Sequence, residues 1–333
     1  MNLLIASWYK KSLLTYLLWP LSVLFRVIIR LRRLAYRKGL YQTHHLEVPV
    51  VIIGNITVGG TGKTPLVIAV VKLLRKAGFR PGIVSRGYRG EAKNWPQQVR
   101  ADSDPKAVGD EAVLLARRCQ CPIAVAPDRV QAAQALLKYN DCNIILADDG
   151  LQHYALGRDI EIVVIDGVRR LGNEHCLPAG PLREPPARLK EVDIVVTNGG
   201  GILRREFLMN FEVGQFHPLR DEKRALLPRQ FMGKTVHAIA GIGFPPRFFD
   251  QLRKLGIDVI EHPFPDHHDF CYEDIVFDDD LPVVMTEKDA VKCRRFARDQ
   301  HWYLSVEAKL DPRFEQRLMM LLGRVDNDIK RVS

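Results

Sequence analysis

The chain has 333 residues, enough for two domains, and its composition of 47% hydrophobic and 26% charged residues is ordinary for a globular protein. Its formal net charge of +10 is local, because residues 1–46 carry eight Lys or Arg and no Asp or Glu, which leaves the rest of the chain close to neutral. This distribution argues against a nucleic-acid surface spread over the fold. The six cysteines form no CxxC pair and no secreted-type framework, which favours reduced thiols in a cytosolic compartment.

The N-terminal segment combines an apolar run with basic residues. Residues 12–25 carry no charge, and four arginines then recur at helical spacing among apolar residues: Arg26, Arg30, Arg33 and Arg37. This pattern is typical of a basic amphipathic helix at a membrane surface. A helix packed on the core and a signal peptide are the alternatives, although no small-x-small cleavage site follows the run. We therefore expect residues 1–40 to form a membrane-associated helix, with an anionic membrane surface as its partner.

A strand, a glycine-rich loop and a helix follow in the order that a phosphate-binding P-loop requires. Residues 50–53 are a β-branched apolar run, and apolar residues recur at helical spacing after Pro65. The candidate ATP-binding residues between them are Thr57, Val58, Gly59, Gly60, Thr61, Gly62, Lys63 and Thr64. Lys63 would reach the β- and γ-phosphates, and the Thr64 hydroxyl would bind Mg²⁺. Thr57 stands where the strict pattern has glycine, so a plain strand-to-helix turn with a solvated Lys63 is the alternative.

Two acidic segments supply candidate catalytic and metal-binding carboxylates. Asp110 and Glu111 open a predicted helix, where acids commonly pair with the helix dipole; the alternative is that Asp110 acts as a base near the phosphates. Residues 144–147 are apolar and lead into Asp148 and Asp149, the pattern that holds Mg²⁺ in the second half of an NTP site. Arg86 follows a predicted strand over 81–85, at a strand end where ligand contacts collect.

Strands and helices alternate through residue 205, which predicts an α/β fold with a parallel sheet and right-handed crossovers. We expect a P-loop kinase-type core over residues 41–205. An irregular linker over residues 206–232 would lead to a smaller α/β domain over residues 233–333.

Arginine and histidine residues in loops extend the candidate site. Arg183 lies in a loop rich in Pro and Gly and is either a phosphate clamp or a surface arginine. His267 and His268 lie between two aspartates. Adjacent histidines with no distant Cys or His partner argue against a metal cluster and favour a loop histidine that faces the nucleotide site.

Seven motifs, in their order along the chain, resemble those of the tetraacyldisaccharide 4'-kinase family: GNITVGGTGKTP, SRGY, VGDE, DDGLQH, PAGPLREP, FPDHHDF and TEKDAVK. The resemblance covers nearly the whole chain. It implies ATP- and Mg²⁺-dependent phosphoryl transfer to the 4'-hydroxyl of a tetraacylated glucosamine disaccharide 1-phosphate, a precursor of lipid A. It also implies action at the cytoplasmic face of the bacterial inner membrane, with no nucleic acid and no obligate protein partner.

The resemblance also implies roles for individual residues. Asp110 would pair with His267 to activate the acceptor hydroxyl, with His268 as the alternative partner. Asp148 and Asp149 would be metal and water ligands, and the family tolerates Thr57 at the start of its P-loop. Three further residues match positions near the phosphates and substrate: Arg129, Arg183 and Glu184.

A phosphate site by itself does not identify the reaction. One alternative is a membrane-associated P-loop ATPase or GTPase that transfers phosphate only to water. The other is a nucleotide-binding scaffold that is anchored to the membrane and catalyses nothing.

Overall fold

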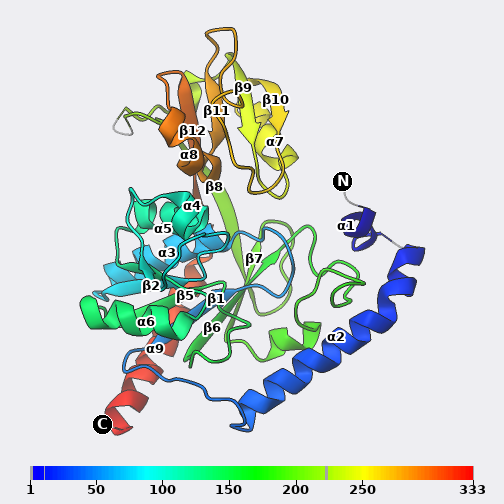
Figure 1. Ribbon diagram of the computed structural model, residues 1–333, viewed down its shortest axis with the longest axis vertical. Coiled ribbons are helices and arrows are strands. Elements are labelled where there is room, and N and C mark those ends of the chain that lie inside the picture. The colour runs from blue at the N-terminus through cyan, green and yellow to red at the C-terminus, as the bar shows by residue number, and fades with distance from the viewer. Residues whose placement is uncertain (1–2, 11, 222–223, 333) are drawn as a thin grey trace.

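The computed structural model describes residues 3–10, 12–221 and 224–332, and these residues form an α/β protein around one large mixed sheet (Figure 1). The strand order is β10-β9-β11-β12-β8-β7-β6-β1-β5-β2-β4-β3. Neighbouring strands are parallel except in the pairs β12–β8 and β3–β4. The strands are β1 Val50–Gly54, β2 Pro81–Ser85, β3 Gln97–Gln98, β4 Ile123–Val125, β5 Ile144–Asp148, β6 Ile160–Asp166, β7 Ile194–Asn198, β8 Glu206–Pro218, β9 Thr235–Ala240, β10 Asp258–Pro263, β11 Val283–Thr286 and β12 His301–Leu310.

Helices cover the sheet and flank it. The α-helices are α1 Leu3–Ser7, α2 Leu13–Arg37, α3 Lys63–Lys76, α4 Pro105–Val108, α5 Asp110–Cys119, α6 Arg129–Tyr139, α7 Pro246–Lys254, α8 Glu287–Cys293 and α9 Pro312–Val332. Short 3₁₀ turns are η1 Pro186–Lys190, η2 Pro228–Gln230 and η3 Arg294–Phe296.

The lower half in Figure 1 contains the parallel strands β1 to β7, apart from the short edge strand β3, as the sequence predicts. Every residue of β1, β5 and β6 is buried, because helices cover both faces of the sheet at these strands. One apolar core lies under α3 and α5, and a second lies under α6 on the opposite face. The carboxyl ends of these strands therefore form a rigid edge on which loops can carry ligand-binding residues.

The predicted irregular linker over residues 206–232 is wrong for its first half. Residues 206–218 form β8, which pairs with β7 at its start and with β12 along most of its length. Alternating apolar residues at 207, 209, 211 and 213 carry the period-two signal of a strand. The sheet consequently continues from one half of the molecule into the other (Figure 1).

The predicted smaller domain over residues 233–333 also differs from the structure at its end. Strands β9, β10 and β11 form the upper half with α7 and α8, around apolar cores of their own. Helix α9, however, leaves β12 and returns to the lower half, where Phe314, Leu318 and Leu322 join the core under α3 and α5. These side chains recur at three-to-four spacing, so packing against the lower half satisfies the apolar face of the helix.

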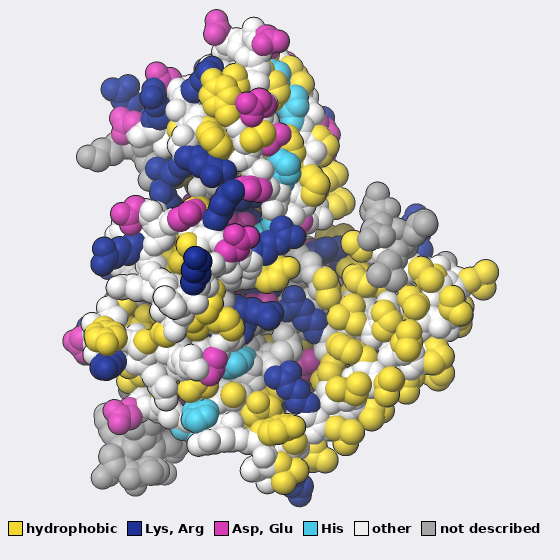
Figure 2. Space-filling model, viewed as in Figure 1, with side chains coloured by type: hydrophobic (Ala, Val, Ile, Leu, Met, Phe, Trp, Pro, Cys, Tyr) yellow, Lys and Arg dark blue, Asp and Glu magenta, His cyan; other side chains and the backbone are white. Residues whose placement is uncertain are grey.

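Two helices, α1 and α2, lie within the predicted range 1–40, and α2 runs continuously through the apolar segment and the arginines, with Pro20 inside it. By length and composition it could cross a membrane, and only 11% of its most apolar window is buried. Apolar side chains cover its outer surface (Figure 2). A helix packed on the core would bury this surface, so the structure does not support that alternative.

Candidate active site

The glycine-rich loop leaves β1 and curls into α3, with Lys63 as the first residue of the helix. Gly59 and Gly62 have φ values of 101° and 94°, which side chains rarely tolerate. A Cβ at Gly62 would also lie 2.7 Å from Asn198 Nδ2. Gly62 occupies the N-cap position and has no side chain, so the first turn of α3 presents backbone N–H groups toward any phosphate held in the loop.

The two aspartates that follow β5 differ in environment. Asp148 is buried, and its Oδ1 atom has no hydrogen-bond partner among the described residues. Burial raises the pKa of Asp148 to about 7, and the charges of Glu111 and Asp149 act in the same direction. Burial also disfavours ionisation of Asp149, but Lys63 and Arg183 outweigh it and lower the pKa of that carboxyl.

Basic side chains converge on Asp149. Lys63 Nζ lies 3.6 Å from Asp149 Oδ1, and Arg183 Nη1 lies 3.1 Å from Asp149 Oδ2. Arg129 is buried and donates from Nη2 to the Asp149 carbonyl at 3.1 Å. The predicted P-loop lysine, the predicted acidic pair and two of the predicted arginines therefore meet at the carboxyl ends of β1 and β5.

Asp110 and His267 meet across the two halves of the molecule. Asp110 is the first residue of α5, and His267 lies in the loop after β10, with its Nδ1 atom 3.0 Å from Asp110 Oδ2. Burial opposes ionisation of Asp110, but the hydrogen bond from His267 and the charge of Lys288 lower the pKa of the carboxyl. His268 pairs instead with Asp274, at 2.9 Å. The structure therefore brings His267, and not His268, to Asp110.

Lys288, at the start of α8, fixes the tautomer of His267. Its Nζ atom lies 3.1 Å from His267 Nε2 and 3.1 Å from Glu111 Oε1. Burial lowers the pKa of Lys288, but Glu111 and Asp110 outweigh it and raise the pKa, so the amine stays protonated. An ammonium group can only donate, so His267 Nε2 accepts and the imidazole proton lies on Nδ1, facing Asp110. Sequence reasoning missed this lysine, although it lies inside the TEKDAVK motif.

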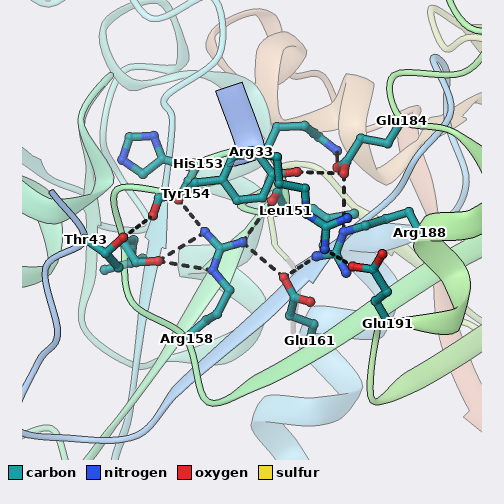
Figure 3. A network of polar contacts seen from close by, with 12 residues as sticks. Arg33, Thr43, Leu151, His153, Tyr154, Arg158, Glu161, Glu184, Arg188 and Glu191 are labelled. Carbon is teal, nitrogen blue, oxygen red and sulfur yellow. Dashed lines mark hydrogen bonds and ion pairs between the residues drawn. The ribbon is translucent and has the colours of Figure 1, made fainter. Parts of the chain in front are cut away.

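The other predicted residues occupy different positions. Arg86 is exposed at the end of β2. Burial lowers the pKa of Arg129, and the charge of Arg86 acts in the same direction. Glu184 is fully buried and does not open onto the site. Its carboxylate accepts hydrogen bonds from Gln152 and Tyr154 and pairs with Arg188 (Figure 3). The prediction that Glu184 contacts substrate or phosphate therefore conflicts with its burial, because the side chains of Gln152, Tyr154 and Arg188 occupy its carboxylate.

The donor set at Asp148 fits a hard divalent cation. No group of three or more His, Cys, Asp or Glu side chains in the described ranges is arranged to hold a metal ion. Mg²⁺, however, is commonly bound through one or two carboxylates together with phosphates and water. The buried, unpartnered Oδ1 atom of Asp148 is an oxygen donor of this kind, and the Thr64 hydroxyl, directly after Lys63 in the chain, is a second. The residues present therefore fit Mg²⁺ held jointly with a nucleotide.

The sequence pattern that defines the family described as LpxK, tetraacyldisaccharide-1-P 4'-kinase, matches residues 14–323. The tetraacyldisaccharide 4'-kinase of Nitrosococcus oceani is 55% identical over 324 residues, which cover 96% of this chain and 94% of that protein. The kinase of the same name from Alkalilimnicola ehrlichii is 52% identical over 306 residues, 92% of each chain.

A solved structure resembles the whole fold. It is the crystal structure of an "apo" form of LpxK from Aquifex aeolicus in complex with ATP, and it superposes with a TM-score of 0.80 at 27% sequence identity. The match covers 93% of this chain and 100% of that one. With the family pattern and the close relatives, it shows that this chain belongs to the tetraacyldisaccharide 4'-kinase family.

Proposed function

We propose that this protein transfers the γ-phosphoryl group of ATP to the 4'-hydroxyl of tetraacyldisaccharide 1-phosphate. The observation that carries the proposal is the pairing of Asp110 with His267 beside a complete P-loop. A general base at this position serves a hydroxyl acceptor, which must lose its proton during transfer. Membership of the family supplies the identity of the acceptor.

The P-loop and its neighbours bind and neutralise the nucleotide phosphates. Backbone N–H groups of residues 59–63 and the N-terminus of α3 would hold the nucleotide phosphates, and Lys63 would offset charge on the transferring group. Asp148 and Thr64 would hold Mg²⁺, which when bound supplies positive charge that neutralises the phosphates. Arg129 and Arg183 fix the position of Asp149, and Arg183 is exposed enough to reach a phosphate oxygen.

Asp110 takes the proton from the acceptor hydroxyl. The Nδ1–H group of His267 donates to Asp110 Oδ2, and the Glu111 N–H donates to Asp110 Oδ1 at 2.9 Å. The two bonds orient the carboxylate, and the second lone pair of Oδ1 can accept from the hydroxyl. Lys288 holds the opposite face of the imidazole and keeps it in this tautomer. Because Asp110 and His267 come from different halves of the molecule, the base is assembled only when the two halves are in contact.

The amphipathic acceptor fits the surface between α2 and the P-loop. A cavity of about 590 Å³ opens there, and its basic lining residues are Lys10, Arg169 and His175. Arg169 donates to the Gly60 carbonyl, so this cavity borders the P-loop. The exposed apolar surface of α2 would face acyl chains and lipid at the cytoplasmic face of the inner membrane, while the arginines would face anionic headgroups (Figure 2).

The proposal is tested by following labelled γ-phosphate in a purified system that contains ATP, Mg²⁺ and the disaccharide lipid. We expect label on the lipid with wild-type protein and at most about one hundredth of that rate with Asp110→Asn, the scale of general-base loss. Asp274→Asn is the matched control, because it removes the partner of His268 and should leave the rate unchanged. Label that appears only as inorganic phosphate would support the ATPase or GTPase alternative and contradict the proposal.

A further inference from the structure

We propose that residues 173–191, which we call the brace, couple the position of the P-loop to the position of helices α1 and α2. Trp8 and Glu191 would then be positioning residues of the nucleotide site, although neither touches it. The proposal rests on the nucleotide site described above and concerns what holds that site in shape.

The brace pairs with the start of the P-loop through its backbone. Thr57 and Leu182 form an antiparallel bridge. Val58 N–H donates to the Pro181 carbonyl at 2.8 Å, and Arg183 N–H donates to the Ile56 carbonyl at 2.6 Å. Three consecutive P-loop residues are therefore held against three consecutive brace residues, and the last of these, Arg183, contacts Asp149 through its side chain.

The opposite side of the brace is held by the N-terminal helices. Trp8, directly after α1, donates from Nε1 to the Pro178 carbonyl at 3.0 Å, and its own carbonyl accepts from Asn173 N–H at 2.9 Å. Ser22, one of the few buried residues of α2, donates to the Cys176 carbonyl at 2.7 Å. These contacts lie within a few residues of the segment that pairs with the P-loop.

Glu191 anchors the far end of the brace to α2. Its carboxylate pairs with Arg33 and, at 2.7 Å, with Arg37. Between the two anchor points the brace is stiffened by Arg188, which is fully buried and pairs with Glu184 and Glu161 (Figure 3).

A second contact reaches the same buried cluster from the helix. Tyr36 of α2 packs against Tyr154, with their ring centroids 5.8 Å apart. The Tyr154 hydroxyl in turn donates to Glu184 Oε2 at 2.7 Å. The brace therefore contacts α2 at Cys176 and Glu191, and through Tyr154 at Glu184, while it contacts the P-loop at one place. Displacing the helices would consequently displace Thr57 and Arg183.

We therefore expect the affinity for nucleotide to depend on how α1 and α2 pack on the brace. Typical couplings between two sites change affinity by roughly 5- to 150-fold. The double variant Trp8→Phe/Glu191→Gln removes the indole donor and the carboxylate charge, while it keeps an aromatic ring at position 8 and the size of the side chain at position 191. We expect it to raise the Kd of a non-hydrolysable ATP analogue with Mg²⁺ by at least about fivefold.

The measurement uses the full chain in detergent micelles, with calorimetric titration of the analogue. Asp141→Asn is the matched control, because it removes one carboxylate of an exposed ion pair with Arg80, away from the brace, and should leave the Kd unchanged. Lys63→Ala tests the nucleotide site itself and should raise the Kd strongly. Hydrogen exchange of residues 54–62 should become faster in the double variant and stay unchanged in Asp141→Asn.

Each result of these titrations either supports or overturns the role of the brace. An unchanged Kd in the double variant, with a raised Kd in Lys63→Ala, would overturn the brace and leave the nucleotide site intact. Equal shifts in the double variant and in Asp141→Asn would also overturn it. An unchanged Kd in Lys63→Ala would instead contradict the nucleotide site. Should the double variant fail to fold, the single change Glu191→Gln at the surface carries the same prediction and the same refutation.

Discussion

Replacing Asp148 with asparagine should stabilise the nucleotide-free protein above neutral pH. Asp148 is fully buried, and burial raises the pKa of its carboxyl from 3.8 to about 7. A carboxyl whose pKa is raised on folding contributes stability that is fully present below its unfolded pKa and is lost as pH rises through its folded pKa. The wild-type protein should therefore lose stability between about pH 4 and pH 7, and Asp148→Asn should not.

The pKa shift sets the size of this effect. A shift of about three units at 1.36 kcal/mol each corresponds to about 4 kcal/mol above pH 7. Between pH 5 and pH 8 the stability difference between variant and wild type should therefore grow by about 2 to 3 kcal/mol. Mg²⁺ with ATP should remove this gain, because a bound cation compensates the buried charge of Asp148 but not the neutral amide.

Urea unfolding in detergent and EDTA, at pH 5 and pH 8, measures the difference. Asp141→Asn serves as the control, because its exposed carboxyl should give a stability difference that hardly changes with pH. A difference between Asp148→Asn and wild type that is the same at both pH values would refute the reasoning. So would a variant that is less stable than wild type at pH 8.

Three further perturbations test the site and its supports. Since neighbouring positive groups lower the pKa of Asp110, kcat measured at saturating ATP and Mg²⁺, where the cation keeps Asp148 ionised, should hold as pH falls from 7 to 5; an activity profile over this range checks it. Arg188→Met should cost about 3 to 5 kcal/mol of stability in urea unfolding, because Glu161 and Glu184 lose their buried partner, and a change below about 1 kcal/mol would contradict this account. Removal of residues 1–38 should release the protein from anionic vesicles at low salt in a flotation assay, since the exposed apolar surface and the arginines of α2 lie within this segment. Full retention on the vesicles would remove the anchor.

The sequence predicted the strand, glycine loop and helix of the P-loop because their signals are local. A P-loop is defined by consecutive residues, and the order of strand, glycine loop and helix determines where Lys63 and Thr64 lie. Asp148 follows an apolar strand for the same reason. The family resemblance, rather than spacing, predicted the pairing of Asp110 with a histidine 157 residues away.

The choice between His267 and His268 could not be made from the sequence, because adjacent loop residues point in different directions. His267 adopts a left-handed backbone, with φ of 60°, which turns its ring toward Asp110. The family resemblance places Glu184 near the phosphates and substrate, whereas the structure buries it. Arg188, four residues further on, pairs with its carboxylate. Gln152 and Tyr154, which hydrogen-bond to it, lie 32 and 30 residues earlier, so only the folded chain brings them there.

The return of α9 to the lower half has a consequence for folding during synthesis. Phe314 and Leu318 complete the core beneath the nucleotide-binding helix, yet they are translated long after that helix. The half that is translated first therefore cannot close its core until α9 has been made, and its long-range contacts make slow, late folding the expectation. A premature stop before residue 312 would accordingly damage the ATP-binding half rather than trim the other one.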